Sequence, residues 1–191
     1  MHSRDQHIAT LHRLMLFTQA VRVKRMIESI TVTPRQTFWI MTTNLLMESA
    51  ALEWSKVFGS RDEDTHWTHS FAAEEHERLR EELRGCIGMD SDQWAAYRDS
   101  IVSYRNQLVA HHDLAASVGA YPKFDPALAA ARFMFDQVRL VADQDWLGGI
   151  PTSLEVWAST VAGNMSAIVN KAFAASAELG PNVPEATTKA A

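Results

Sequence analysis

The chain has 191 residues, of which 47% are apolar and 21% charged, as expected for one globular domain. Its net charge is −5 and it has a single cysteine, which disfavours broad nucleic-acid binding through an overall basic surface and excludes an internal disulfide. No apolar run approaches the roughly 18 residues of a membrane span, and no secretory signal is recognisable, so we expect a cytoplasmic protein.

The charge is unevenly distributed along the chain. Residues 1–35 carry a net charge of +4 and the remaining residues carry −9. A basic N-terminal helix beside an acidic body can present one positive face, whereas the plainer interpretation is a solvated helix face.

The first two helices are predicted from apolar spacing and a capping signal. Apolar residues recur at helical spacing from about Arg4 to Glu28, which predicts the first helix. Thr33 as N-cap and Pro34 at the first helical position predict a second helix that ends near Val57. Its inward face should carry side chains three or four residues apart, namely Phe38, Met41, Leu45, Leu46, Ser49 and Leu52.

The next two helices are separated by glycines. A charged third helix is predicted over residues 72–84, with Gly85 and Gly88 at its end. Asp90 or Ser91 can then cap a fourth helix. The inward stripe of this fourth helix is expected to be Trp94, Tyr97, Ile101, Tyr104 and Leu108.

A further proline and a glycine pair delimit the fifth helix. Residues 113–123 are predicted to form a loop, and Asp125 as cap followed by Pro126 starts the helix. Gly148 and Gly149 break the helical pattern again.

A sixth helix is expected over residues 152–178, and residues 180–191 are typical of a disordered tail. No stretch alternates apolar and polar residues as a strand would, and no internal repeat is recognisable. The sequence therefore predicts an all-α helical bundle of about five to six helices, with residues 1–179 as a single domain.

The residues best suited to chemistry lie near the C-terminal end of the fourth helix, which should reach about His112. Arg105, Asn106, His111 and His112 fall within two helical turns. Histidine titrates near neutral pH and can act as a general acid or base. The arginine guanidinium matches phosphate oxygens and stays charged, and a helix C-terminus favours the imidazolium form.

This segment resembles the signature of the HEPN superfamily, an arginine and usually a polar residue followed by a histidine after about four to six intervening residues. Here Arg105-Asn106 is followed by His111, with five residues between the arginine and the histidine. The resemblance covers about residues 35–145. Within this range the chain is similar to a HEPN subgroup linked to abortive phage infection. Further matching stretches are 54–60, 66–67 and 121–135, the last with a Pro-x-x-Asp-Pro start.

The resemblance implies a metal-independent endoribonuclease, without a cofactor, whose signature helices face each other in a homodimer. RNA would be cut by attack of its own 2′-hydroxyl, leaving a 2′,3′-cyclic phosphate. His111 would transfer a proton, Arg105 would stabilise charge on the phosphoryl group, and Asn106 would orient the reacting groups. A toxin or phage-defence effector, with an antitoxin as a possible partner, fits this family.

The proton-transfer residue could be either neighbouring histidine. On an ideal helix of 3.6 residues per turn, Arg105 and His111 are about 120° apart, whereas His112 shares nearly the same face as Arg105. We prefer His111 because it matches the Ala-His form of the motif. A helix paired from a second copy, or an unwound last turn, would bring His111 and Arg105 to one phosphate.

Two other functions stay open. A non-catalytic helical interaction module, such as a toxin–antitoxin or scaffold partner, would be indicated by a buried and fully hydrogen-bonded Arg105. A metal-dependent bundle enzyme would need inward carboxylates and histidines on several helices, and the sequence offers only one Glu-x-x-His spacing. The residues considered for that site are His66, His69, His76, Glu63, Glu74 and Glu75.

Overall fold

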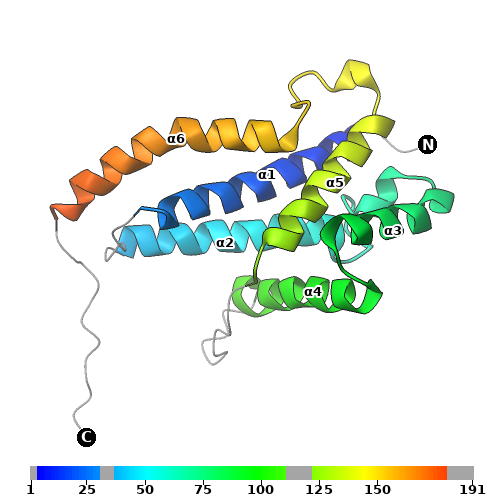
Figure 1. Cartoon of the computed structure of the whole chain (residues 1–191), viewed down its shortest axis with the longest axis horizontal. Coiled ribbons are helices and arrows are strands. Elements are labelled where there is room, and N and C mark those ends of the chain that lie inside the picture. The colour runs from blue at the N-terminus through cyan, green and yellow to red at the C-terminus, as the bar shows by residue number, and fades with distance from the viewer. Residues whose placement is uncertain (1–3, 31–36, 111–121, 180–191) are drawn as a thin grey trace, which may run out of the picture.

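The computed structural model describes residues 4–30, 37–110 and 122–179. Within these ranges it contains six α-helices and no strand, which confirms the predicted all-α helical bundle (Figure 1). No helix in the described ranges combines the length and apolar character needed to cross a membrane. The helices are α1 (Arg4–Glu28), α2 (Thr37–Phe58), α3 (His76–Ile87), α4 (Ser91–Tyr104), α5 (Asp125–Val141) and α6 (Leu154–Ala177).

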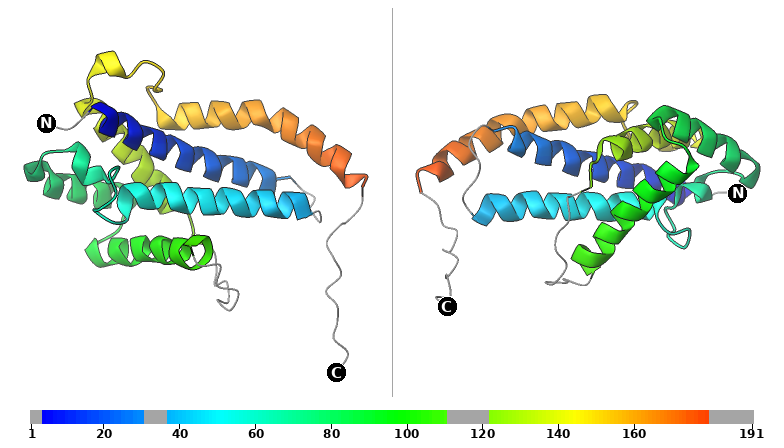
Figure 2. Two further views of the ribbon diagram at one scale, coloured as in Figure 1. Left: turned by 180° about the vertical axis from the view of Figure 1, so that it is seen from behind. Right: turned by 60° about the horizontal axis from the view of Figure 1, so that its bottom comes forward.

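Helix α1 lies at the centre of the bundle. It runs antiparallel to α2 along one side and is flanked by α6 on the other, while α5 crosses both α1 and α2 (Figures 1 and 2). Its apolar residues Leu11, Leu14 and Phe17 are fully buried in the main core. Helix α4 packs against the opposite side of α2, so the end of the predicted signature helix lies at the edge of the bundle.

The predicted inward face of α2 is wrong at Phe38, Met41, Leu45 and Ser49, which are all exposed. Phe38, Met41 and Leu45 are 65%, 56% and 59% exposed. Apolar residues lie on nearly every side of this helix, so spacing alone does not select the buried face. Packing against α1 and α4 selects a different set, which is Met47, Ala50, Ala51, Trp54, Val57 and Phe58.

Glycine conformation decides two helix ends. A side chain at Gly59, directly after α2, would place its Cβ 2.4 Å from the Ser55 carbonyl oxygen, so glycine is needed there. Gly88 adopts φ 69° and ends α3 in the left-handed conformation that favours glycine. Gly85 was expected to end the same helix but lies within it, because its position is exposed and a helix tolerates an isolated glycine there.

The fifth helix differs from the prediction at both ends, whereas α6 lies within two residues of its predicted bounds. Phe124, not Asp125, occupies the N-cap of α5, and Asp125-Pro126 forms the first turn. Helix α5 ends at Val141, well before the glycine pair, and Ser153 caps α6. The predicted cap at residues 33–34 and the tail over 180–191 lie outside the described residues.

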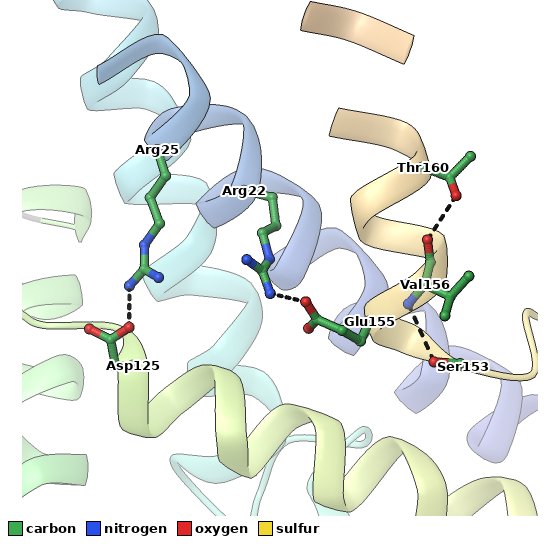
Figure 3. A network of polar contacts seen from close by, with 7 residues as sticks. All are labelled: Arg22, Arg25, Asp125, Ser153, Glu155, Val156 and Thr160. Atoms are coloured by element: carbon green, nitrogen blue, oxygen red, sulfur yellow. Dashed lines mark hydrogen bonds and ion pairs between the residues drawn. The ribbon is translucent and has the colours of Figure 1, made fainter. Parts of the chain in front are cut away.

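Two arginines of α1 fix the starts of α5 and α6 (Figure 3). Arg25 Nη2 lies 2.8 Å from an Asp125 carboxylate oxygen, and Arg22 forms an ion pair with Glu155. Because Asp125 and Glu155 lie in the first turns of their helices, these carboxylates also face the positive ends of the helix dipoles. Part of the positive charge predicted for the N-terminal helix is therefore paired with carboxylates of neighbouring helices at the surface.

The N-terminus of α4 is held by a capping box. The Asp90 carboxylate accepts a hydrogen bond from the backbone N–H of Gln93 at 2.8 Å. In return, the side-chain oxygen of Gln93 accepts one from the backbone N–H of Asp90 at 3.0 Å. We predict that Asp90→Ala lowers the free energy of unfolding by about 1 kcal/mol, measured by urea denaturation. Asp64→Ala, an exposed aspartate outside any helix, is the control and should change stability by less than about 0.5 kcal/mol. Equal effects of the two variants would contradict the capping role.

Candidate functional site

The structure places two of the four predicted site residues at the end of α4. Arg105 and Asn106 begin η3 (Arg105–Ala110), a segment of π-helix that continues directly from α4. The Arg105 side chain is 21% exposed, and Asn106 is exposed. His111 and His112 lie outside the described residues, so the structure does not test whether either histidine meets Arg105.

Arg105 is held in place without being fully hydrogen-bonded. Its Nη1 lies 3.9 Å from Glu63 Oε1, which is an ion-pair distance but longer than a hydrogen bond. Its Nε is buried and has no hydrogen-bond partner among the described residues. A guanidinium has five N–H donors, so this one keeps unused donor capacity at the end of α4.

The winding of η3 changes the geometry expected from an ideal helix. A π-helix forms hydrogen bonds from residue i to i+5, so it turns less per residue than an α-helix. The angle of about 120° between Arg105 and His111 assumed 3.6 residues per turn throughout, and that assumption fails from Arg105 onward. The sequence offered no local signal for this change of winding.

The histidines considered for a metal site have other partners. His69 Nε2 donates to the Arg61 carbonyl at 2.7 Å, and His76 Nε2 lies 3.0 Å from the Thr68 carbonyl. In the part of the chain that the structure describes, no group of three or more His, Cys, Asp or Glu side chains could hold a metal ion.

A second site, which the sequence did not predict, is a pocket between α3, α4 and the segment after α2. We call it the arginine pocket. Its volume is about 190 Å³, and its walls include two tryptophans, Trp67 and Trp94. Four arginines line it, namely Arg61, Arg80, Arg84 and Arg98, together with His66.

The acidic neighbours of the pocket only partly offset its positive charge. Glu77 lies 2.9 Å from Arg80 and 3.9 Å from Arg84, and Asp99 lies 3.0 Å from Arg98. No aspartate or glutamate is among the lining residues. The chain is negative overall, yet this pocket is locally positive, which no count over the whole sequence could reveal.

His66 lines the pocket with a buried side chain that is neutral near pH 7. The backbone N–H of Thr68 donates to His66 Nδ1 at 3.3 Å, so the neutral ring carries its proton on Nε2. Burial, together with the nearby positive charges, lowers the pKa of His66 from 6.5 to about 4. These charges belong to His69, Arg61, Arg98 and His76.

This pKa predicts an acid-sensitive contribution to stability. Between pH 6.5 and 4 the unfolded chain holds a proton on His66 that the folded chain lacks, so stability falls as the pH falls. The slope from one such group is at most about 1.4 kcal/mol per pH unit. We expect His66→Asn, which keeps an acceptor for the Thr68 N–H but does not titrate, to lose less stability than the wild type over this range. Urea denaturation at several pH values measures this difference, and parallel curves would contradict the prediction.

Three of the six tryptophans, Trp39, Trp54 and Trp67, are buried. Comparisons with models of known protein families, with curated proteins and with solved structures found no match for this chain. The assignment of the candidate sites is therefore argued from their residues and geometry alone.

Proposed function

We propose that this protein is a metal-independent endoribonuclease of the HEPN type, acting as a homodimer and serving as a toxin or phage-defence effector. In this proposal His111 transfers a proton to or from the reacting oxygens, with His112 as its alternative. Arg105 stabilises charge on the phosphoryl group and Asn106 orients the nearby groups. The 2′-hydroxyl of the RNA is the nucleophile, so the strand is cut without a metal or cofactor.

The observation that best supports this proposal is the setting of Arg105. A rare π-helix begins at this residue, and such segments are frequent at functional sites. The guanidinium is partly buried, lies beside Glu63 and has an Nε without a partner among the described residues, so it differs from a fully hydrogen-bonded structural arginine.

The surroundings of Arg105 also suit an RNA strand. Arg98 lies seven residues earlier on α4, so its Cβ lies on nearly the same helix face. The loop after α2 reaches both positions, because Arg61 lines the pocket with Arg98 while Glu63 lies beside Arg105. A strand with one phosphate near Arg105 would thus have a second positive region along the same helix.

The test is RNA cleavage by the purified protein in the presence of EDTA. Several single-stranded RNAs are incubated with the protein, and the product ends are examined for 2′,3′-cyclic phosphate. Cyclic ends formed in EDTA are expected. Cleavage that disappears in EDTA would indicate a metal-dependent enzyme, and no cleavage by a folded wild type would favour the alternative below.

The alternative is a non-catalytic helical interaction module. The observation that favours it is the exposed apolar side of α2, which includes Phe38, Met41 and Leu45. Exposed apolar side chains grouped on one element often mark a protein interface. A homodimer or an antitoxin could cover this surface, and the ribonuclease proposal also requires a second copy.

A further inference from the structure

The arginine pocket gathers four guanidinium groups from three separate parts of the chain. Arg61 belongs to the loop after α2, Arg80 and Arg84 lie one turn apart on α3, and Arg98 lies on α4. Bringing these like charges around one cavity is unfavourable unless opposite charge is supplied. Glu77 and Asp99 supply two negative charges, and both lie outside the pocket lining.

The donors in this pocket have unused capacity. Arg61 is exposed and forms no ion pair with any described residue. Arg98 is paired with its own neighbour Asp99, on a side chain that is 40% exposed, and such surface pairs contribute little. Both guanidinium groups can therefore donate to a ligand without breaking a strong internal contact.

His66 adds a neutral donor to the pocket wall. Its Nδ1 accepts from Thr68, so its Nε2 carries the proton and has no hydrogen-bond partner among the described residues. A neutral N–H beside several guanidinium groups suits an anion with more than one oxygen acceptor. Trp94, which is only partly buried, gives the same cavity an apolar surface on which a base can rest, next to the more deeply buried Trp67.

We propose that the arginine pocket binds the phosphate monoester of a nucleotide, with guanidinium groups holding the phosphate oxygens and the tryptophan wall contacting the base. A phosphate monoester carries up to two negative charges and three acceptor oxygens, and arginine binds such oxygens in bidentate pairs. The same chemistry is offered by a free nucleotide and by the 5′-phosphate end of a nucleic-acid strand. This site goes beyond the proposed ribonuclease, because binding here requires no cleavage and does not use His111.

The test is isothermal titration calorimetry of the full chain with AMP. Adenosine, which lacks the phosphate, is the control ligand. Short DNA strands with a 5′-phosphate or a 5′-hydroxyl form the second arm, since DNA has no 2′-hydroxyl and cannot be cut by the proposed mechanism. Binding of AMP but not of adenosine is expected if the source is a free nucleotide. Binding of only the 5′-phosphorylated strand is expected if the source is a nucleic-acid end.

Variants locate the binding. Arg98→Gln and Arg61→Gln should each weaken the affinity about tenfold, as expected for the loss of a charge-assisted hydrogen bond. Arg132→Gln, at an exposed arginine on α5 that is not among the lining residues, is the matched control and should bind as the wild type does. Because Arg61 lies on an exposed loop, its variant should fold normally, and far-ultraviolet circular dichroism checks this.

Three results would overturn the proposal. The wild type could fail to bind any of the phosphorylated ligands, adenosine could bind as well as AMP, or the pocket variants could bind like Arg132→Gln. None of these results depends on RNA cleavage. If the protein binds AMP but cuts no RNA, the nucleotide site stands and the ribonuclease proposal is wrong. If it cuts RNA but binds no phosphorylated ligand in the pocket, the ribonuclease proposal stands and the nucleotide site is wrong.

Discussion

Replacing His111 by alanine is expected to slow RNA cleavage by about 10²–10⁴-fold, the usual contribution of a positioned general acid or base. The reason is that the 2′-hydroxyl must lose a proton and the leaving oxygen must gain one. The rate is measured in EDTA under single-turnover conditions, so that substrate binding and product release do not mask the chemical step. His12→Ala is the matched control, because His12 is exposed on α1 and should leave the rate unchanged.

Further variants separate the roles within the motif. Arg105→Ala should lower the rate by about 10²–10³-fold, as for loss of one donor that stabilises transition-state charge. Arg105→Lys keeps the charge but loses the planar fork, so only part of the rate should return. If His112→Ala abolishes cleavage while His111→Ala does not, the proton-transfer role passes to His112. If none of these substitutions changes the rate, the ribonuclease assignment is wrong.

Trp54→Ala is expected to lower the free energy of unfolding by about 3–5 kcal/mol, the cost of truncating a large buried aromatic side chain. Trp54 is fully buried on α2, and its ring lies 4.9 Å from that of Phe58 and 5.8 Å from that of Trp94. The substitution would leave a cavity where α2 meets α4. Urea denaturation followed by far-ultraviolet circular dichroism measures the loss without relying on the removed tryptophan.

Two variants make this prediction specific. Phe38→Ala removes an aromatic residue from the same helix at an exposed position and should change stability by less than about 0.5 kcal/mol. Trp54→Phe should cost less than Trp54→Ala, because it keeps an aromatic ring and removes a buried indole N–H that has no partner among the described residues. A loss of less than about 1 kcal/mol for Trp54→Ala would contradict the central packing role of this residue.

The helices were largely predictable because their signals are local. The first helix was predicted over the residues that α1 occupies, and one of the two predicted cap residues of the fourth helix, Asp90, is its N-cap. Both depend on side chains within a turn or two of each other. Where a local signal was shared by two positions, as with Gly85 and Gly88, only the backbone conformation distinguished them.

The candidate sites were predictable only in part. The sequence placed Arg105 and Asn106 at a helix end, but the change to π-helical winding and the contact with Glu63 came from the structure. The arginine pocket gave almost no signal in the sequence. Only the spacing of Arg80 and Arg84 puts two of its arginines on one helix face.

Capping residues and apolar spacing act over a few residues, so the sequence alone predicts an all-helical chain and the approximate position of each helix. Only the tertiary structure decided which side of α2 is buried, because apolar residues surround that helix and its neighbours choose among them. It also brought Arg61 and Arg98 to one pocket. Helix packing sets such long-range proximity, and packing depends on the fit of whole helix surfaces rather than on adjacent residues.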